Sequence, residues 1–206
     1  MPPRCIGLAL SQPVVVICPH FVGIEAAAQW LSLESSFVAL YRTGRRPVLE
    51  AHCKRSRKRF DAQYLLDAGQ PLTPLVARLK NGTPLFLLPD VDSDSGSAVF
   101  SPFFGVDTAT YRTAAWSAAH LGVAVLPVSV RRSTAGQFVA TMHEPLAGLT
   151  HDVVAGTHRV NEAIEALVRA APAHYDWAQP CFATRRGGEP ALHSHKVLQF
   201  TRDRIA

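Results

Sequence analysis

The segment from Cys18 to Glu25, CPHFVGIE, contains the pair of residues best suited to chemistry, because His20 is followed five positions later by a carboxylate. An imidazole exchanges protons near neutral pH, and a carboxylate at its Nδ1 would fix the tautomer while Nε2 faces a cleft. Such a base can deprotonate a hydroxyl, which then attacks an acyl carbonyl without a protein nucleophile. We therefore predict that His20 is a general base and Glu25 its partner. The alternative is a hydrogen-bonded structural histidine.

Cys18 offers a second chemical possibility, a thiol nucleophile two residues before His20. Its apolar flanks are more typical of a buried structural thiol. The other three cysteines, Cys5, Cys53 and Cys181, form no CxxC pair, so the spacing predicts neither a zinc site nor a disulfide framework.

An acidic run, PDVDSDSG, places Asp90, Asp92 and Asp94 at alternate positions, as in calcium loops. The sixth position is Ser95, where such a loop requires glycine, and the twelfth is Ser101, where it requires glutamate. We expect no metal here, but a turn that caps a strand and positions its neighbours, with Asp92 available to hold an arginine.

Positive charge is concentrated between residues 41 and 60. The chain carries 21 Lys and Arg against 16 Asp and Glu, a net charge of +5. The only acid in this stretch is Glu50, whereas eight residues are basic: Arg42, Arg45, Arg46, Lys54, Arg55, Arg57, Lys58 and Arg59. The cluster predicts an anionic partner, which charge alone leaves open among nucleic acid, phospholipid headgroups, a phosphorylated glycolipid and an acidic carrier protein. A solvated basic helix is the plain alternative.

Aromatic residues supply candidates for an apolar site. Phe100, Phe103 and Phe104, ended by Gly105, could line a slot for an acyl chain, although their types alone favour ordinary core packing. Tyr175 and Trp177 are either interfacial anchors at a membrane surface or packing residues.

The elements that must position these residues alternate between strands and helices. Strands are expected at 13–18, 36–41, 84–88 and 123–130, with an edge strand at 138–143 and a loop or short strand at 101–106. Helices are expected to begin near residue 23 and to span 47–59, 72–80, 109–120 and 152–169. The pattern predicts one α/β domain over residues 1–206 with a parallel or mixed sheet. His20 and Asp90 both follow strand ends, where reactive groups of open α/β sheets gather.

The apolar stretches are too short for a membrane helix. The longest uninterrupted ones are residues 14–18 and 122–128, against the roughly 20 residues that a spanning helix needs. The first four residues are also too short and too weakly charged for a targeting segment.

The order of these motifs resembles that of the late acyltransferases of lipid A biosynthesis, a branch of the lysophospholipid acyltransferase superfamily. The matching segments cover nearly the whole chain: PVVVICPHFVGIE, LYRTGRRPVLE, SRKRF, LKNGTPLFLLPDVDSDSGSAVFSPFFGVDTAT, LGVAVLPVSVRR and HYDWAQPCFATRRGGEP. LLPDVD followed by VFSPFFGV is the most specific part.

The resemblance implies an αβα sandwich with a mixed, mainly parallel central sheet, an acyl thioester on acyl carrier protein as donor, a phosphorylated lipid A precursor as acceptor, and no cofactor. It assigns His20 as the base and Glu25 as its partner. It also places Arg57, with Arg59 just beyond, as phosphate-binding groups, since arginine can bind two phosphate oxygens together. The complete set expected at the substrate is Arg57, Arg59, Arg42, Asp90, Asp92, Phe103, Phe104 and Gly105.

Three departures from the family pattern bear on the substrate. The chain is expected to lack the amino-terminal membrane helix of the family, Ser56 replaces a glycine, and QPCFATRR replaces a more basic stretch. We therefore expect an O-acyltransferase held peripherally at the cytoplasmic face of the inner membrane by its basic surface. The alternatives are an acyltransferase for lysophospholipids or other small lipids, and a non-catalytic module that binds lipid or carrier protein. We expect no nucleic-acid binding, because aromatic residues do not alternate with the cations.

Overall fold

The computed structural model describes residues 12–41, 47–58, 60, 63–67, 72–93, 96 and 98–192. The elements in chain order are β1 (Val14–Ile17), α2 (Ile24–Glu34), β2 (Phe37–Tyr41), α3 (Pro47–Arg57), β3 (Gln63–Asp67), α4 (Thr73–Lys80), β4 (Leu85–Leu87), β5 (Val99–Phe103), β6 (Val106–Thr110), α5 (Thr113–Leu121), β7 (Ala124–Arg132), β8 (Phe138–Met142), α6 (Val153–Ala170), η1 (Pro172–His174) and η2 (Arg186–Gly188).

A six-stranded sheet in the order β3-β2-β4-β1-β7-β8 forms the centre of the molecule. Every pairing within it is parallel except that of β7 with the edge strand β8. The prediction of a mixed, mainly parallel sheet is confirmed.

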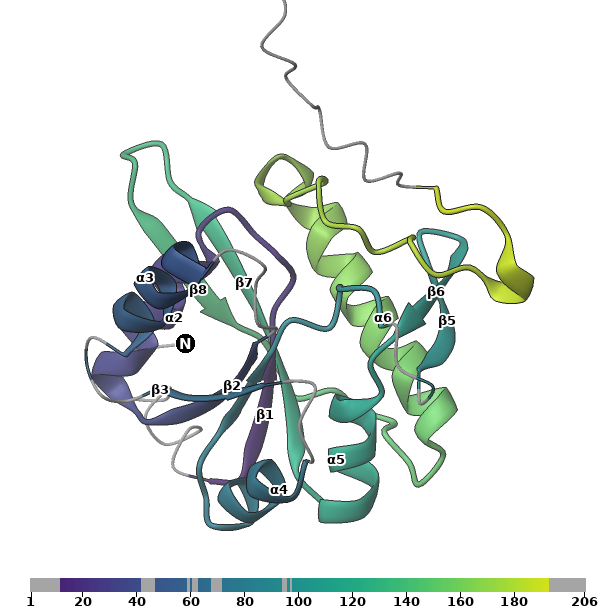
Figure 1. The fold of residues 1–206 in the computed structure, drawn as a ribbon, viewed down its shortest axis with the longest axis horizontal. Coiled ribbons are helices and arrows are strands. Elements are labelled where there is room, and N and C mark those ends of the chain that lie inside the picture. Colours follow the sequence, from purple (N-terminus) through teal and green to yellow (C-terminus); the bar gives the residue numbers. More distant parts are fainter. Residues whose placement is uncertain are drawn as a thin grey trace, which may run out of the picture.

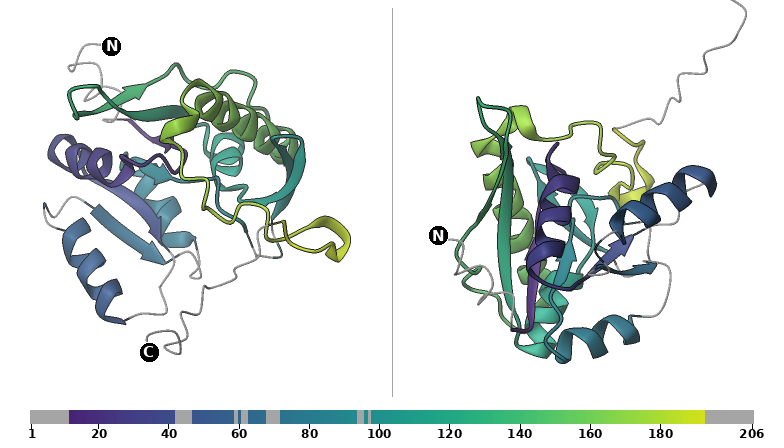
Figure 2. Two further views of the ribbon diagram at one scale, coloured as in Figure 1. Left: turned by 90° about the horizontal axis from the view of Figure 1, so that it is seen from above. Right: turned by 90° about the vertical axis from the view of Figure 1, so that its left-hand side faces the viewer.

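Helices cover both faces of this sheet, as Figures 1 and 2 show, with α2 and α3 on one side and α5 and α6 on the other. The arrangement follows from right-handed crossovers. The chain leaves β1 through α2 toward β2 and returns from β3 through α4 to β4, so α2 and α4 lie on opposite faces. The predicted αβα sandwich is therefore the observed architecture.

β1 is buried on both faces. All four of its residues, VVVI, are at most 2% exposed, and both neighbouring strands, β4 and β7, pair with it in parallel. β-branched side chains favour extended backbone, and a strand covered on both faces reads as a continuous apolar run. The continuous hydrophobic run therefore indicates that β1 is a central strand of the sheet. The carboxyl end of β1 leads directly to His20.

The expected helix over 109–120 is wrong at its start. Residues 106–110 form β6, which pairs with β5 in a separate antiparallel hairpin, and α5 begins only at Thr113. Phe104 and Gly105 occupy the turn with φ values of 50° and 77°, the left-handed pair that a two-residue hairpin turn requires. Thr108, Ala109 and Thr110 are all buried, and the pairing of β6 with β5 overrides the helix propensity of Ala109.

β3 was also missed by the sequence prediction. β3, with the sequence QYLLD, pairs with β2 at the far edge of the sheet from β8. No turn signal in the sequence marks the boundary between the preceding basic segment and these five residues.

Candidate active site

His20 and Asp90 meet because their two strands are neighbours. β1 pairs with β4 such that Ile17 lies opposite Leu87, and His20 and Asp90 each follow three residues later. Parallel strands end at the same edge of a sheet, so both side chains emerge together there. The sequence prediction that both residues lie just beyond strand ends is confirmed.

Asp90 holds His20 by two hydrogen bonds. Oδ1 of Asp90 lies 2.8 Å from Nδ1 of the imidazole, and Oδ2 accepts from the backbone N–H of His20 at 2.7 Å. The Asp90 side chain is fully buried, whereas 17% of the His20 side chain is exposed. The imidazole is thus anchored on the protein side, with part of its surface open to solvent.

The predicted contact of Glu25 with Nδ1 of His20 is wrong, because Asp90 occupies that position. Glu25 instead binds Arg57 of α3, with Oε1 at 2.5 Å from one guanidinium nitrogen and Oε2 at 3.4 Å from Nε. Glu25 raises the pKa of Arg57, so the guanidinium stays charged. Gln29, one turn further along α2, donates to the carbonyl of Ser56. The face of α2 that carries residues 25 and 29 is therefore directed at α3.

Burial around Asp90 disfavours the thiol-nucleophile alternative. Burial, and secondarily the charge of Asp90, raises the pKa of Cys18 well above its ordinary value. The same two causes in the same order raise the pKa of Tyr175, and they raise that of Cys181 to about 11. Cys18 is fully buried and stays a thiol, as its apolar flanks indicated.

The segment after α6 fixes the backbone around His20. The carbonyl of His20 accepts from the N–H of Asp176 at 2.8 Å, and Val22 donates to the carbonyl of His174 at 2.8 Å. Between them, Phe21 and Tyr175 form an antiparallel bridge. This contact between residues more than 150 positions apart was not predicted, and no local pattern in the sequence signals it.

Tyr175 and Trp177 differ in their surroundings. Tyr175 is buried and its ring packs edge-on against Phe21 and Trp177, which agrees with a packing role. Trp177 is 53% exposed, and its indole N–H donates to the carbonyl of Pro172.

Asp92 binds Thr184 rather than an arginine. Its two oxygens accept from the backbone N–H of Thr184 at 2.8 Å and from the hydroxyl at 2.7 Å. Nearby, Arg185 and Arg186 both bind Asp107. These contacts attach residues 184–186 to the loop after β4 and to the β5–β6 hairpin.

The residues expected to form an acyl slot lie at the β5–β6 turn. Phe103 is buried in the main core, and Phe104 packs against Phe103 and Trp177. The backbone N–H of Phe104 donates to Glu165 of α6 at 2.8 Å, while Gly105 is exposed in the turn. These contacts show the packing role that the residue types favoured.

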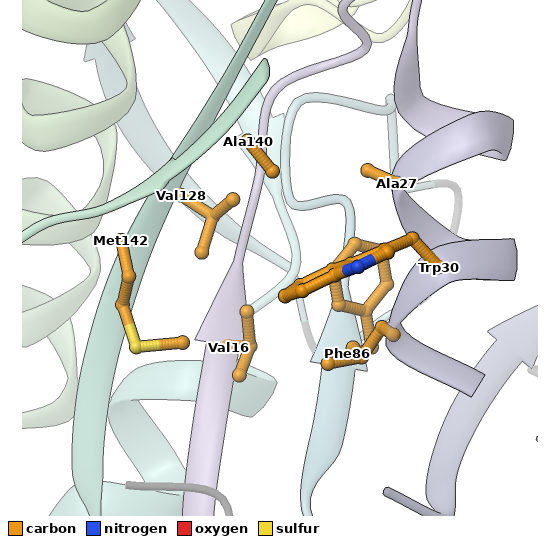
Figure 3. Close-up of a pocket in the computed structure, with 8 residues that line it drawn as sticks. Val16, Ala27, Trp30, Phe86, Val128, Ala140 and Met142 are labelled. Carbon is orange, nitrogen blue, oxygen red and sulfur yellow. The ribbon is translucent and has the colours of Figure 1, made fainter. Parts of the chain in front are cut away.

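Apolar cavities lie against the sheet. The one in Figure 3, between α2 and strands β1, β4, β7 and β8, has a volume of about 30 Å³, the space of a single water molecule, and is too small for a fatty acyl chain. A second, of about 100 Å³, is formed by residues that include Pro89 and Val91, the immediate neighbours of Asp90. Its other lining residues are Leu40, Tyr41, Leu87, Leu88, Tyr111 and Thr113.

Several residues named in the sequence predictions lie outside the described part of the chain: Cys5, Arg42, Arg45, Arg46, Arg59, Asp94 and Ser95. Within the described ranges, no three His, Cys, Asp or Glu residues gather closely enough to hold a metal ion. No helix within those ranges has the length and apolar content needed to cross a membrane.

Comparison with known proteins identifies related sequences over most of the chain. Residues 7–184 match the family described as bacterial lipid A biosynthesis acyltransferase. The chain is 26% identical over 188 residues to the lipid A biosynthesis lauroyltransferase of Escherichia coli, a match that covers 90% of this chain and 61% of the relative. It is 26% identical over 185 residues to the palmitoleoyltransferase of the same organism, covering 89% and 60%. A lipid A biosynthesis acyltransferase of Haemophilus influenzae is 27% identical over 184 residues, covering 88% and 57%. The chain thus spans about 60% of the length of the curated relatives it matches.

Proposed function

Because the chain belongs to the bacterial lipid A biosynthesis acyltransferase family, we propose that it transfers a fatty acyl chain from a thioester on acyl carrier protein to a hydroxyl of a lipid A precursor or a related lipid. The observation that carries this proposal is the anchored imidazole of His20 at the carboxyl end of β1. An imidazole held on its Nδ1 side presents Nε2 as a base, which is the group that acyl transfer to a hydroxyl requires.

In the proposed reaction, Nε2 of His20 takes the proton of the acceptor hydroxyl as its oxygen attacks the thioester carbonyl. The tetrahedral intermediate then collapses, the carbon–sulfur bond breaks, and the imidazolium returns its proton to the leaving thiolate. The products are an ester and the free thiol of the carrier. No covalent intermediate with the protein forms, in keeping with the buried, protonated state of Cys18.

Arg57 is the proposed anchor for a phosphate of the acceptor. It lies on α3, and its guanidinium is fixed by Glu25 while 34% of the side chain stays exposed. A planar guanidinium that is already oriented can bind phosphate oxygens in pairs. Glu25 thereby belongs to the acceptor side of the proposed site.

The cavity beside Pro89 and Val91 is the proposed place for the first carbons of the acyl chain. It is lined mainly by apolar side chains and adjoins the segment that carries Asp90. A volume of about 100 Å³ accommodates only part of a fatty acyl chain, so the remainder would extend beyond it.

Peripheral attachment to the inner membrane is proposed to involve the β7–β8 hairpin. Phe138 and Val139 are 46% and 48% exposed, and they lie opposite the exposed cations Arg132 and Arg131 in the strand register. Exposed apolar residues beside cations suit the surface of an anionic bilayer. Figure 1 shows this hairpin extending beyond the body of the sheet. In the strand order, β8 and β3 are the two opposite edge strands.

The proposal is tested with purified protein, an acyl carrier protein thioester and a panel of acceptors: a phosphorylated lipid A precursor, its dephosphorylated form and a lysophospholipid. Transfer to the phosphorylated precursor, lost by about 10³-fold in His20→Ala, is expected. His120→Ala, which changes an exposed histidine on α5, is the matched control and keeps the unaltered rate. Equal rates in His20→Ala and the unaltered protein would contradict the proposal, as would binding without turnover on every acceptor.

A further inference from the structure

We infer that Asp90, and not Glu25, is the positioning residue that fixes the tautomer of His20, so that Nδ1 carries the proton and Nε2 has the free lone pair. The inference deepens the proposed function, on which the role of His20 as a base depends. Its evidence is the pair of contacts that one carboxylate makes with one residue.

The backbone contact fixes how the carboxylate is turned. Oδ2 of Asp90 accepts from the backbone N–H of His20 at 2.7 Å, and a backbone N–H can only donate. With Oδ2 committed, Oδ1 is left facing Nδ1 at 2.8 Å. Asp90 itself cannot turn away, because its side chain is fully buried beyond the end of β4.

The second contact then sets the tautomer. An ionised carboxylate has only acceptor oxygens, so the 2.8 Å contact is a hydrogen bond only if Nδ1 donates. A neutral imidazole carries one N–H, which leaves Nε2 unprotonated and able to accept a proton. The same pair of contacts stabilises the imidazolium after proton transfer.

Glu25 is committed elsewhere. Both of its oxygens contact Arg57, and its side chain is 61% exposed. An exposed carboxylate bound to a cation contributes little to orienting a third group. Glu25 therefore acts on the guanidinium and Asp90 on the imidazole.

Asp90→Asn distinguishes a role of Asp90 in orienting the His20 imidazole from a role in packing, because the Asn amide has one acceptor group and one donor group. The backbone N–H of His20 still needs an acceptor, so the amide oxygen turns to it and the NH₂ faces Nδ1. Nδ1 must then accept, and the proton moves to Nε2. The Asn side chain has nearly the shape of Asp, so the fold is kept while the imidazole is in the wrong tautomer for a base.

The experiment is ¹⁵N NMR of the imidazole nitrogens in histidine-labelled protein without substrate, at about pH 8, where an ordinary histidine is neutral. His20→Gln assigns the signals of His20 among the nine histidines. We expect Nδ1 protonated and Nε2 unprotonated in the unaltered protein and in Glu25→Gln, and the reverse in Asp90→Asn. In the transfer assay, Asp90→Asn is expected to lose about 10²- to 10⁴-fold in kcat, with KM changed by no more than a few-fold.

An Nε2-protonated ring in the unaltered protein, or a reversed tautomer in Glu25→Gln, would overturn the inference. If Asp90→Asn does not fold, the spectra of the other two proteins still decide. The tautomer is measured without turnover, so failure of the proposed function, seen as no transfer to any acceptor, is distinguished from failure of this inference.

Discussion

Glu25 lies close to His20 in the sequence and Asp90 lies close to it in space, and the environments of these two carboxylates are opposite. Asp90 is fully buried and binds a histidine that is 17% exposed, whereas Glu25 is 61% exposed and binds an arginine that is 34% exposed. The Asp90–His20 pair lies beyond the carboxyl ends of β1 and β4, beside the segment after α6. The Glu25–Arg57 pair joins the surface helices α2 and α3. The buried pair is suited to holding one geometry, and the exposed pair to exchanging a partner with an anionic ligand.

The comparison also separates two energetic roles. In a buried pair, removal of one partner leaves a polar group without compensation, which costs several kcal/mol. In an exposed pair, water replaces the lost partner, and the loss is typically below 1 kcal/mol. Changes near Asp90 should therefore affect both the fold and the rate, and changes near Glu25 mainly the binding of substrate.

The largest effect is expected from Asp90→Ala. It leaves the backbone N–H and Nδ1 of His20 without their acceptor, so the free energy of unfolding should fall by about 2–4 kcal/mol and kcat by about 10³-fold. Urea unfolding and the transfer assay measure the two losses. Unaltered stability of Asp90→Ala would show that the buried pair of Asp90 and His20 contributes no more to the fold than the exposed pair of Glu25 and Arg57.

The next largest effect is expected from Arg57→Ala, on substrate binding. Loss of a charge-assisted hydrogen bond to phosphate costs about 1.5–3 kcal/mol, which corresponds to a rise of about 10- to 150-fold in KM for a phosphorylated acceptor. The KM for the dephosphorylated acceptor should stay nearly constant, which makes that acceptor the control. An equal rise for both acceptors would remove Arg57 from phosphate recognition.

Alkaline pH should destabilise the buried region through Cys181. Burial, and secondarily the charge of Asp90, raises the pKa of this thiol from 9.0 to about 11. Between these values the unfolded chain loses the proton while the folded chain keeps it, so the stability present below pH 9 should decline by about 1–3 kcal/mol as pH rises to about 11. Urea unfolding at several pH values measures this decline, and Cys181→Ala should make it shallower. An identical decline of stability with pH in the unaltered protein and in Cys181→Ala would contradict the assignment of this decline to Cys181.

Glu25→Gln should scarcely alter stability. Its bond with Arg57 is exposed, and such pairs contribute about 0–1 kcal/mol to the free energy of unfolding. Thermal unfolding of this variant beside Asp90→Asn provides the measurement. If Glu25→Gln is the less stable of the two, the contrast between the pairs is reversed.

A separate effect, on membrane binding rather than on stability or catalysis, is expected at the β7–β8 hairpin, where the double variant Arg131→Gln with Arg132→Gln removes two exposed cations. Each cation at an anionic surface contributes about 1 kcal/mol, so loss of both should weaken partitioning onto anionic vesicles by about 30-fold, with no change on neutral vesicles. Sedimentation with vesicles measures both. Unchanged binding to anionic vesicles would place the membrane contact elsewhere.

Much of the fold was predictable because its central strands carry unambiguous patterns. The run of β1 is buried on both faces, and α6 carries a repeat of apolar residues on one face with Asp152 as its N-cap. β3 and β6 were not predicted, since short strands take their pairing from distant partners rather than from their own residues.

The candidate site was predictable in its membership but not in its pairing. His20, Asp90, Glu25 and Arg57 were all identified from sequence, and two of them were placed at strand ends. Which carboxylate binds the imidazole depends on the register of β1 with β4, in which Ile17 lies opposite Leu87. Spacing along the chain favoured Glu25, whereas the strand order places Asp90 beside His20, and this could be inferred only once β1 and β4 were known to be neighbours.

The most direct test of the account is the ratio of kcat between Asp90→Asn and Glu25→Gln, measured in one transfer assay at saturating donor and acceptor. If Asp90 orients the base and Glu25 orients only a binding group, Asp90→Asn should be at least about tenfold slower than Glu25→Gln. Equal rates, or a slower Glu25→Gln, would contradict the account and return Glu25 to the role of partner of His20.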